Sequence, residues 1–144
     1  FGHIPSEGPV AAHLGVEEGT SVLRIHRVRL ADDQPVGIHD AYLPSDIPIS
    51  QAEVEEMESL YALLEKKGVQ LVEAEETIEA VPADSTQAKL LALNVGDPLL
   101  KVTRTVFSRE RRPIEYVEAM YRSDLYRYST RLRREPSGGG ESRC

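Results

Sequence analysis

The sequence predicts an α+β domain, a mostly antiparallel sheet with flanking helices, and three observations lead to this class. Residues 22–42 and 99–121 each alternate apolar and polar side chains around a turn, as β-hairpins do. Residues 58–67 have the apolar spacing and the flanking serine and glycine of an amphipathic helix. The two halves of the chain also resemble each other. We therefore expect five or six strands, built from two duplicated helix-hairpin halves, with helices covering one face.

The internal repeat is the strongest pattern in the chain. Residues 11–47 lie along residues 88–125, with one extra residue in the second hairpin turn. Each half contains a helical turn, a glycine turn and a long hairpin, which indicates a duplicated unit. The matched pairs include Leu14 with Leu91, Gly19 with Gly96, Arg27 with Arg104, and Pro35 with Pro113.

Composition and charge narrow the class of protein. At 144 residues and 40% hydrophobic content, the chain suits one globular domain with a core. A net charge of −7 repels phosphate backbones, so this chain is not expected to contact nucleic acid itself. The single cysteine, Cys144, excludes an intrachain disulfide and a cysteine zinc site. No apolar run reaches the roughly 20 residues of a membrane helix, and no secretory leader is visible. We expect a cytoplasmic protein, and interpret the start at Phe1 as a missing N-terminal part.

The first half is expected to begin with a linker. Residues 1–9 contain two prolines and two glycines, so we assign them as a lead-in. Residues 10–14 form a helical turn that Gly15 ends. The hairpin follows, with its break at residues 32–35, where two aspartates precede a glutamine and a proline.

The connection between the halves contains the best-defined helix. Residues 43–48 are irregular because they contain two prolines, and residues 50–57 suit a short acidic helical turn. The helix over residues 58–67 has Ser59 as its N-cap and is followed by Gly68.

The second half adds a long strand before its own helix and hairpin. Residues 69–81 alternate, with Val72, Ala74, Ile78 and Ala80 inward and the glutamates at 73, 75 and 79 outward. Residues 84–91 form a short helix capped by Asp84 or Ser85. Residues 123–128 are a last helical turn or edge segment. The domain is assigned to residues 10–130, and residues 131–144 to a disordered tail.

Two arginines on the first strand point to a binding site. Side chains alternate along a strand, so Leu23, Ile25, Arg27 and Arg29 share one face. If the two aliphatic residues face the core, both guanidiniums lie at its edge, where an unpaired charge costs several kcal/mol. An anion should meet them. It could be a ligand or a carboxylate of a neighbouring strand.

The repeat places further candidates near this pair. Arg104 is the counterpart of Arg27, and a cleft between pseudo-symmetric halves is a natural place for a small ligand. Glu115 and Tyr121 share one face of the last strand, although Glu115 could simply neutralise Arg104. His39 lies between small residues on the return strand, and is either a ligand contact or a satisfied core residue.

The start of the helix is a further candidate. Its first backbone N–H groups lack partners, so together with the Ser59 hydroxyl they can hold an anion, unless Ser59 only caps the helix. The sequence shows no nucleophile and base at recognisable spacing, no metal cluster and no glycine-rich phosphate loop. No metal, cofactor or catalytic residue is therefore expected.

Three segments carry a family resemblance: RVRLADDQPVGIHDAYLP, ESLYALLEKKG and GDPLLKVTRTVFSRERRPIEYVEAMYRSD. Their order and spacing resemble the UTRA effector-binding domain of HutC-type GntR transcriptional regulators, over residues 10–128. The resemblance implies a chorismate-lyase-like fold with an effector pocket between the halves. It also implies a dimer and an N-terminal winged helix-turn-helix domain that binds operator DNA. No such domain is visible in this chain.

The resemblance also implies roles for particular residues. In members that sense phosphorylated amino sugars, the positions of Arg27 and Arg29 hold the phosphate, helped by those of Ser59 and Tyr61. The positions of Glu115 and Tyr121 contact the sugar. This sequence differs from those sensors at His39. They have a carboxylate at this position, which accepts hydrogen bonds from an amine or from sugar hydroxyls.

We therefore expect an effector-binding and dimerisation domain that senses an anionic metabolite, such as a phosphorylated sugar. It would form a homodimer and reach operator DNA only through the missing domain. Two alternatives stay open from the sequence. One is a chorismate-lyase-type enzyme, because the fold is shared. The other is a dimerisation module with a vestigial pocket.

Overall fold

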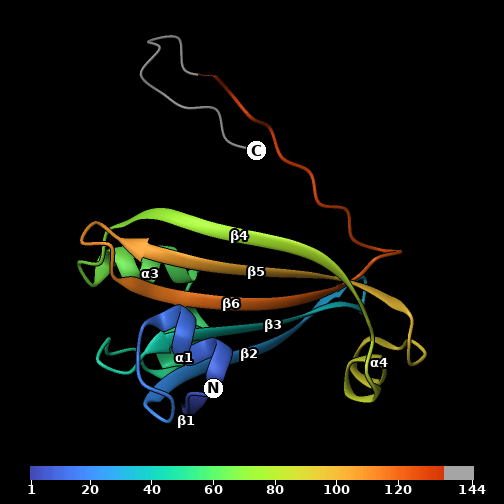
Figure 1. Cartoon of the computed structure of the whole chain (residues 1–144), viewed down its shortest axis with the longest axis horizontal. Coiled ribbons are helices and arrows are strands. Elements are labelled where there is room, and N and C mark those ends of the chain that lie inside the picture. Colours follow the sequence, from blue (N-terminus) through green and yellow to red (C-terminus); the bar gives the residue numbers. More distant parts are fainter. Residues whose placement is uncertain (135–144) are drawn as a thin grey trace.

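A six-stranded antiparallel sheet forms the centre of the structure, a computed structural model that describes residues 1–134. The strand order is β1-β2-β3-β6-β5-β4 (Figure 1). The elements are β1 Gly2–Pro5, α1 Gly8–Leu14, β2 Ser21–Ala31, β3 Gln34–Pro44, α2 Gln51–Glu56, α3 Leu60–Lys66, β4 Leu71–Pro82, α4 Ser85–Leu91, β5 Pro98–Ser108 and β6 Pro113–Arg122. The predicted α+β class is confirmed.

The duplication is visible in the strand pairing. Pro5 of β1 lies opposite Ser21 of β2, and Pro82 of β4 lies opposite Pro98 of β5, both 77 positions later. Both hairpins also change register at the matching place, after Arg29 in the first and before Phe107 in the second. The halves meet along β3 and β6. A pseudo-two-fold axis therefore passes between these two central strands.

Residues 1–9 are not the linker that the sequence suggested. Gly2–Pro5 form β1 at the edge of the sheet, and α1 begins at Gly8. Pro9 is tolerated because it lies in the first turn of α1, where backbone N–H groups have no helical partner anyway. The first half therefore starts with a strand. Strand β1 corresponds to the end of β4, which pairs with β5 in the second half.

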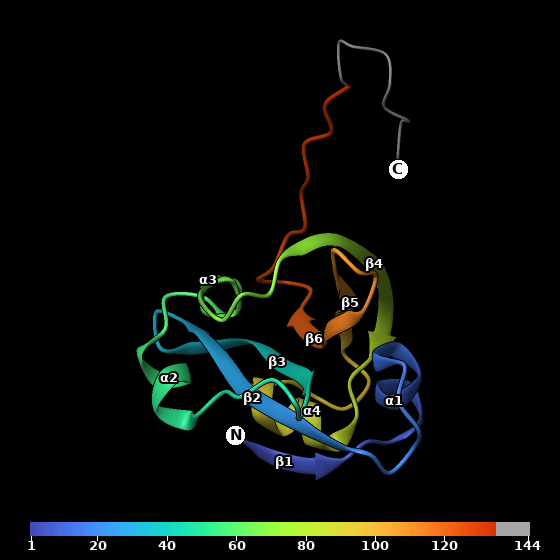
Figure 2. The same ribbon diagram turned by 90° about the vertical axis from the view of Figure 1, so that its left-hand side faces the viewer.

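The helices cover both faces of the sheet, whereas the sequence led us to expect one. Figure 2 shows α2 and α3 on one side of the sheet and α1 on the other. Val10 and Leu14 of α1 pack on Tyr42 and Tyr116, and α4 packs on the same face through Leu91. Both faces are occupied because the central strands carry apolar side chains at odd and even positions alike.

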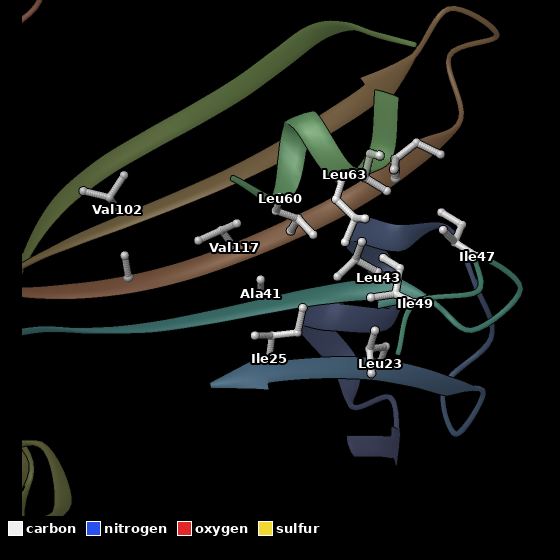
Figure 3. Close-up of a cluster of buried hydrophobic side chains, with 13 residues drawn as sticks. Leu23, Ile25, Ala41, Leu43, Ile47, Ile49, Leu60, Leu63, Val102 and Val117 are labelled. Atoms are coloured by element: carbon white, nitrogen blue, oxygen red, sulfur yellow. The ribbon is translucent and has the colours of Figure 1, made fainter. Parts of the chain in front are cut away.

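The main core lies under α3 (Figure 3). Leu60, Leu63 and Leu64 of this helix pack on residues of β2, β3 and β6, including Leu23 and Leu43. As predicted, α3 starts at a serine cap, where the Ala62 N–H donates to Ser59 Oγ at 3.1 Å. The helix is short, so it covers only part of this face and leaves the rest of the sheet beside it open.

Two further expectations about the strands need correction. Strand β4 is exposed on both faces, because it is an edge strand that no helix covers. Val72 and Ile78, which were expected to point inward, are 57% and 38% exposed. The first hairpin turn is tighter than expected and consists of Asp32 and Asp33, both with positive φ. Pro35 belongs to β3, which pairs only with β2 before Gly37, so its missing N–H breaks no bond to β6.

The chain after β6 has no regular element within the described residues. Residues 123–125 form a hydrogen-bonded turn and not an edge strand, with the Tyr126 N–H donating to the Arg122 carbonyl at 3.0 Å. Residues 135–144 of the predicted tail lie outside the described part of the chain. None of the helices in residues 1–134 has the length and apolar character that a membrane crossing requires.

Candidate ligand-binding site

A pocket of about 390 Å³ lies between the open part of the sheet and the start of α3. All of the site residues expected from the sequence line it: Arg27, Arg29, His39, Ser59, Tyr61, Arg104, Glu115 and Tyr121. The structure therefore brings these residues together from four strands and one helix start. The lining also includes Glu58, Leu60, Glu76, Val102, Val117 and Ala119.

The floor of the pocket follows from the strand register. Cross-strand partners point to the same face of a sheet, so residues opposite one another form rows. Two such rows form the floor: Arg27, His39, Ala119 and Val102 in one, and Arg29, Gly37 and Tyr121 in the other. In the first row, the small side chain of Ala119 leaves Arg27 and His39 facing a hollow.

Arg27 and Arg29 have no protein partner in the part of the chain that is described. Neither takes part in an ion pair or a side-chain hydrogen bond within residues 1–134. No carboxylate of a neighbouring strand in this part of the chain meets them. Both residues are also exposed to solvent, so the cost of an unpaired charge at the core edge, which the sequence led us to expect, does not arise. Two adjacent guanidiniums beside a pocket form a site for an anion, because each can donate two parallel hydrogen bonds to it.

Arg104 is held differently. Its guanidinium donates to Glu76 Oε2, with 2.7 Å from one terminal nitrogen and 2.9 Å from Nε, and to the Tyr61 hydroxyl at 3.1 Å. The carboxylate that neutralises Arg104 is thus Glu76 of β4 and not Glu115. This ion pair also links the start of α3 to the edge strand across the pocket.

Two buried polar atoms of the pocket lack a hydrogen-bond partner among residues 1–134: His39 Nδ1 and Glu115 Oε1. Burial, followed by the charges of Arg29 and Arg27, lowers the pKa of His39 to about 4. Burial also raises the pKa of Glu115 to about 7. The site therefore presents a neutral imidazole and an easily protonated carboxyl beside its arginines. His39 is not a satisfied core residue, because unpaired buried polar atoms are rare without a function or a missing partner.

Tyr121 lies directly over Gly37. A Cβ atom placed on Gly37 would come within 2.6 Å of the Tyr121 ring, so only glycine leaves room for the ring there. The space that the sequence suggested beside His39 on this side is therefore filled by Tyr121. Its ring forms the wall at this end of the pocket.

The sequence arguments missed Glu76 as a site residue. It lies opposite Arg104 in the register of β4 and β5. Its position has the same parity as Ala74 and Ile78, which were expected to point inward, so the alternation contained the signal. Glu58, also missed, directly precedes the predicted cap residue Ser59. Residues 1–134 contain no cluster of three or more acidic, histidine or cysteine side chains that could hold a metal ion.

Comparison with known proteins identifies the family. Residues 1–127 match the model of the UTRA domain. The chain belongs to the UTRA domain family. This UTRA domain is 29% identical to the HTH-type transcriptional repressor NagR of Bacillus subtilis, over 87% of this chain and 52% of that protein. It is 32% identical to the HTH-type transcriptional regulator Rv0792c of Mycobacterium tuberculosis, over 94% of this chain and 51% of that protein. The chain thus spans about half the length of these relatives.

The fold of this UTRA domain matches a solved structure described as the ligand-binding domain of a GntR-family transcriptional regulator from Bordetella bronchiseptica. The TM-score is 0.81 at 29% identity, and the match covers 92% of this chain and 86% of that chain. Both relatives are named as transcriptional regulators, and the matched structure is described as a ligand-binding domain.

Proposed function

We propose that this UTRA domain binds an anionic small molecule in the pocket and thereby regulates transcription. The observation that carries the proposal is the pair of guanidiniums, Arg27 and Arg29, which face the pocket without a partner among residues 1–134. An external anion would supply the missing partner. The regulated activity would be operator binding by an N-terminal winged helix-turn-helix domain outside this chain, in the cytoplasm.

A phosphate group fits the arginine end of the pocket best. It can accept paired hydrogen bonds from both guanidiniums, and the Ser59 and Tyr61 hydroxyls line the same pocket. Ser59 Oγ accepts the cap bond from Ala62, which leaves its own proton for a ligand. The phosphate would thus bridge β2 and the start of α3.

Hydroxyl groups of the ligand would occupy the rest of the pocket floor, from His39 beside Arg27 to Glu115 on β6. Glu115 Oε1 and His39 Nδ1 are buried and in need of partners, and both can bond to a sugar or polyol hydroxyl. Tyr121 adds an aromatic wall. A phosphorylated sugar or a similar metabolite would satisfy both ends. An ammonium group is disfavoured beside Arg27, Arg29 and neutral His39.

Regulation requires the ligand to favour one arrangement of two protomers. A coupling of about 1–3 kcal/mol would change operator affinity severalfold or more. We propose a homodimer, with the uncovered edge strand β4 as its candidate contact, because a free strand edge can pair with another chain.

The test is a thermal-shift screen with phosphorylated sugars, their unphosphorylated counterparts and organic acids, followed by calorimetry. The wild-type domain should be stabilised by a phosphorylated compound, and the double variant Arg27→Ala/Arg29→Ala should lose this binding while still unfolding cooperatively. Arg24→Ala is the matched control, because Arg24 is on the same strand but pairs with Asp40 on the opposite face. Unchanged affinity in the double variant would refute the assignment. Stabilisation by none of the compounds would indicate a vestigial pocket.

A further inference from the structure

The segment that follows β6 returns to the pocket. We name residues 125–128 the strap. In Figure 1 the chain leaves the end of β6, turns back and passes β4. Within the strap, the Tyr126 ring stacks on the Tyr121 ring, with centroids 3.9 Å apart and planes 9° from parallel. Tyr128 donates a hydrogen bond of 2.7 Å to Glu76 Oε1.

Both partners of the strap belong to the pocket lining, and they come from different strands. The Tyr121 ring of β6 lies close to Gly37, and Tyr126 stacks on this same ring. Glu76 of β4 uses one carboxylate oxygen for Tyr128 and the other for Arg104. The strap therefore fixes an aromatic wall directly, and a guanidinium through one intermediate carboxylate.

We propose that the strap is a positioning element of the ligand site, in which Tyr126 and Tyr128 hold Tyr121 and Arg104 in the geometry that receives the ligand. The inference rests on the proposed function and extends the site to two residues that do not line the pocket. Preorganised contacts raise affinity because the ligand need not order them itself. A side chain that must first be immobilised costs part of the binding energy.

The linkage between strap and ligand must act in both directions. If docking of the strap strengthens ligand binding, ligand binding strengthens docking of the strap by the same factor. Arg127 lies within the strap, so cleavage by trypsin after Arg127 reports its undocking. If Glu76 instead competed with the ligand for Arg104, the strap would weaken binding, and the variants below would bind more tightly than the wild type.

The test compares Tyr126→Ala and Tyr128→Phe with the wild-type domain, using glucose 6-phosphate as the probe, because its hydroxyl groups would reach the part of the pocket that Tyr121 and Arg104 line. Tyr126→Phe is the matched control, since it keeps the stacked ring. We expect the Kd for glucose 6-phosphate to rise at least about fivefold in the first two variants, the lower end of typical couplings. It should stay unchanged in Tyr126→Phe. Trypsin should cleave after Arg127 faster in the two weakened variants, and glucose 6-phosphate should slow this cleavage in the wild type.

The outcomes separate this inference from the proposed function. If the wild type binds glucose 6-phosphate and both weakened variants bind it equally well or more tightly, the positioning role is overturned and the anion site stands. If the wild type binds neither glucose 6-phosphate nor inorganic phosphate, the anion site itself fails, and the positioning role fails with it. Urea unfolding of each variant shows whether a change in Kd reflects loss of the fold.

Discussion

At the scale of single residues, the buried carboxyl of Glu115 lowers the stability of the fold. Its side chain is 3% exposed, and burial raises the pKa of the carboxyl from 4.5 to about 7. At a pH between these two values, the Glu115 carboxyl is ionised in the unfolded chain and protonated in the folded protein. Stability therefore falls as the pH rises through this window, and the full loss is present above pH 7.

Glu115→Gln should remove this pH dependence. The amide keeps the shape and cannot ionise, so the variant should be more stable than the wild type at pH 8. The upper bound is about 3.5 kcal/mol, since the pKa shift from 4.5 to about 7 contributes about 1.4 kcal/mol per pKa unit. Near pH 4.5 the difference should largely disappear. Urea unfolding of both proteins across this range measures it. A difference that is the same at both ends would show that ionisation of Glu115 is not its cause.

At the scale of elements, α1 and α4 are equivalent helices with different ends. Gly15 follows α1 with φ +66°, and Ala92 follows α4 with φ +57° in the same left-handed conformation. That conformation strains alanine but not glycine. Ala92→Gly should therefore raise the free energy of unfolding by about 0.5–1 kcal/mol. This is the strain removed from the folded state, reduced by the larger conformational entropy that glycine gives the unfolded chain.

Thermal and urea unfolding would measure this change. Gly15→Ala supplies the reciprocal control at the matching position and should lower stability by a similar amount. No gain in Ala92→Gly would mean that the turn after α4 has relaxed the strain by other contacts.

Elements with local signals could be predicted from the sequence, and those that depend on tertiary pairing could not. The cap residues Ser59 and Asp84 placed the starts of α3 and α4 correctly. Strand β1 was missed because four residues with a terminal proline show no alternation, and only pairing with β2 makes them a strand. The faces that the helices cover could not be predicted either, since both faces of the central strands are apolar.

The same distinction applies to the site. Alternation alone placed Arg27 and Arg29 on one face, and the repeat added Arg104. The partner of Arg104 could not be read from the sequence, because it depends on the register of β4 against β5, which sets Glu76 opposite it. Alternation gives the face of a strand but not its shift along a neighbour.

At the scale of the whole molecule, the pocket exists because the duplication is incomplete. The duplicated helices α1 and α4 cover one face, and only the unique connection between the halves, with α2 and α3, covers the other. Arg27 and Arg104 are equivalent positions on either side of the resulting hollow. Arg104 is hydrogen-bonded to Glu76 and Tyr61, whereas Arg27 has no such partner among the described residues.

This asymmetry predicts that the two arginines of β2 are dispensable for folding. Both are exposed and line the same pocket as a third guanidinium, that of Arg104, so their loss removes repulsion and little packing. The double variant Arg27→Ala/Arg29→Ala should unfold in urea within about 0.5 kcal/mol of the wild type, or be more stable at low salt. Arg104→Ala should instead lose about 1 kcal/mol, since it leaves Glu76 without its cation. A loss above about 2 kcal/mol in the double variant would mean that the fold itself depends on these two side chains, as a structural ion pair would require.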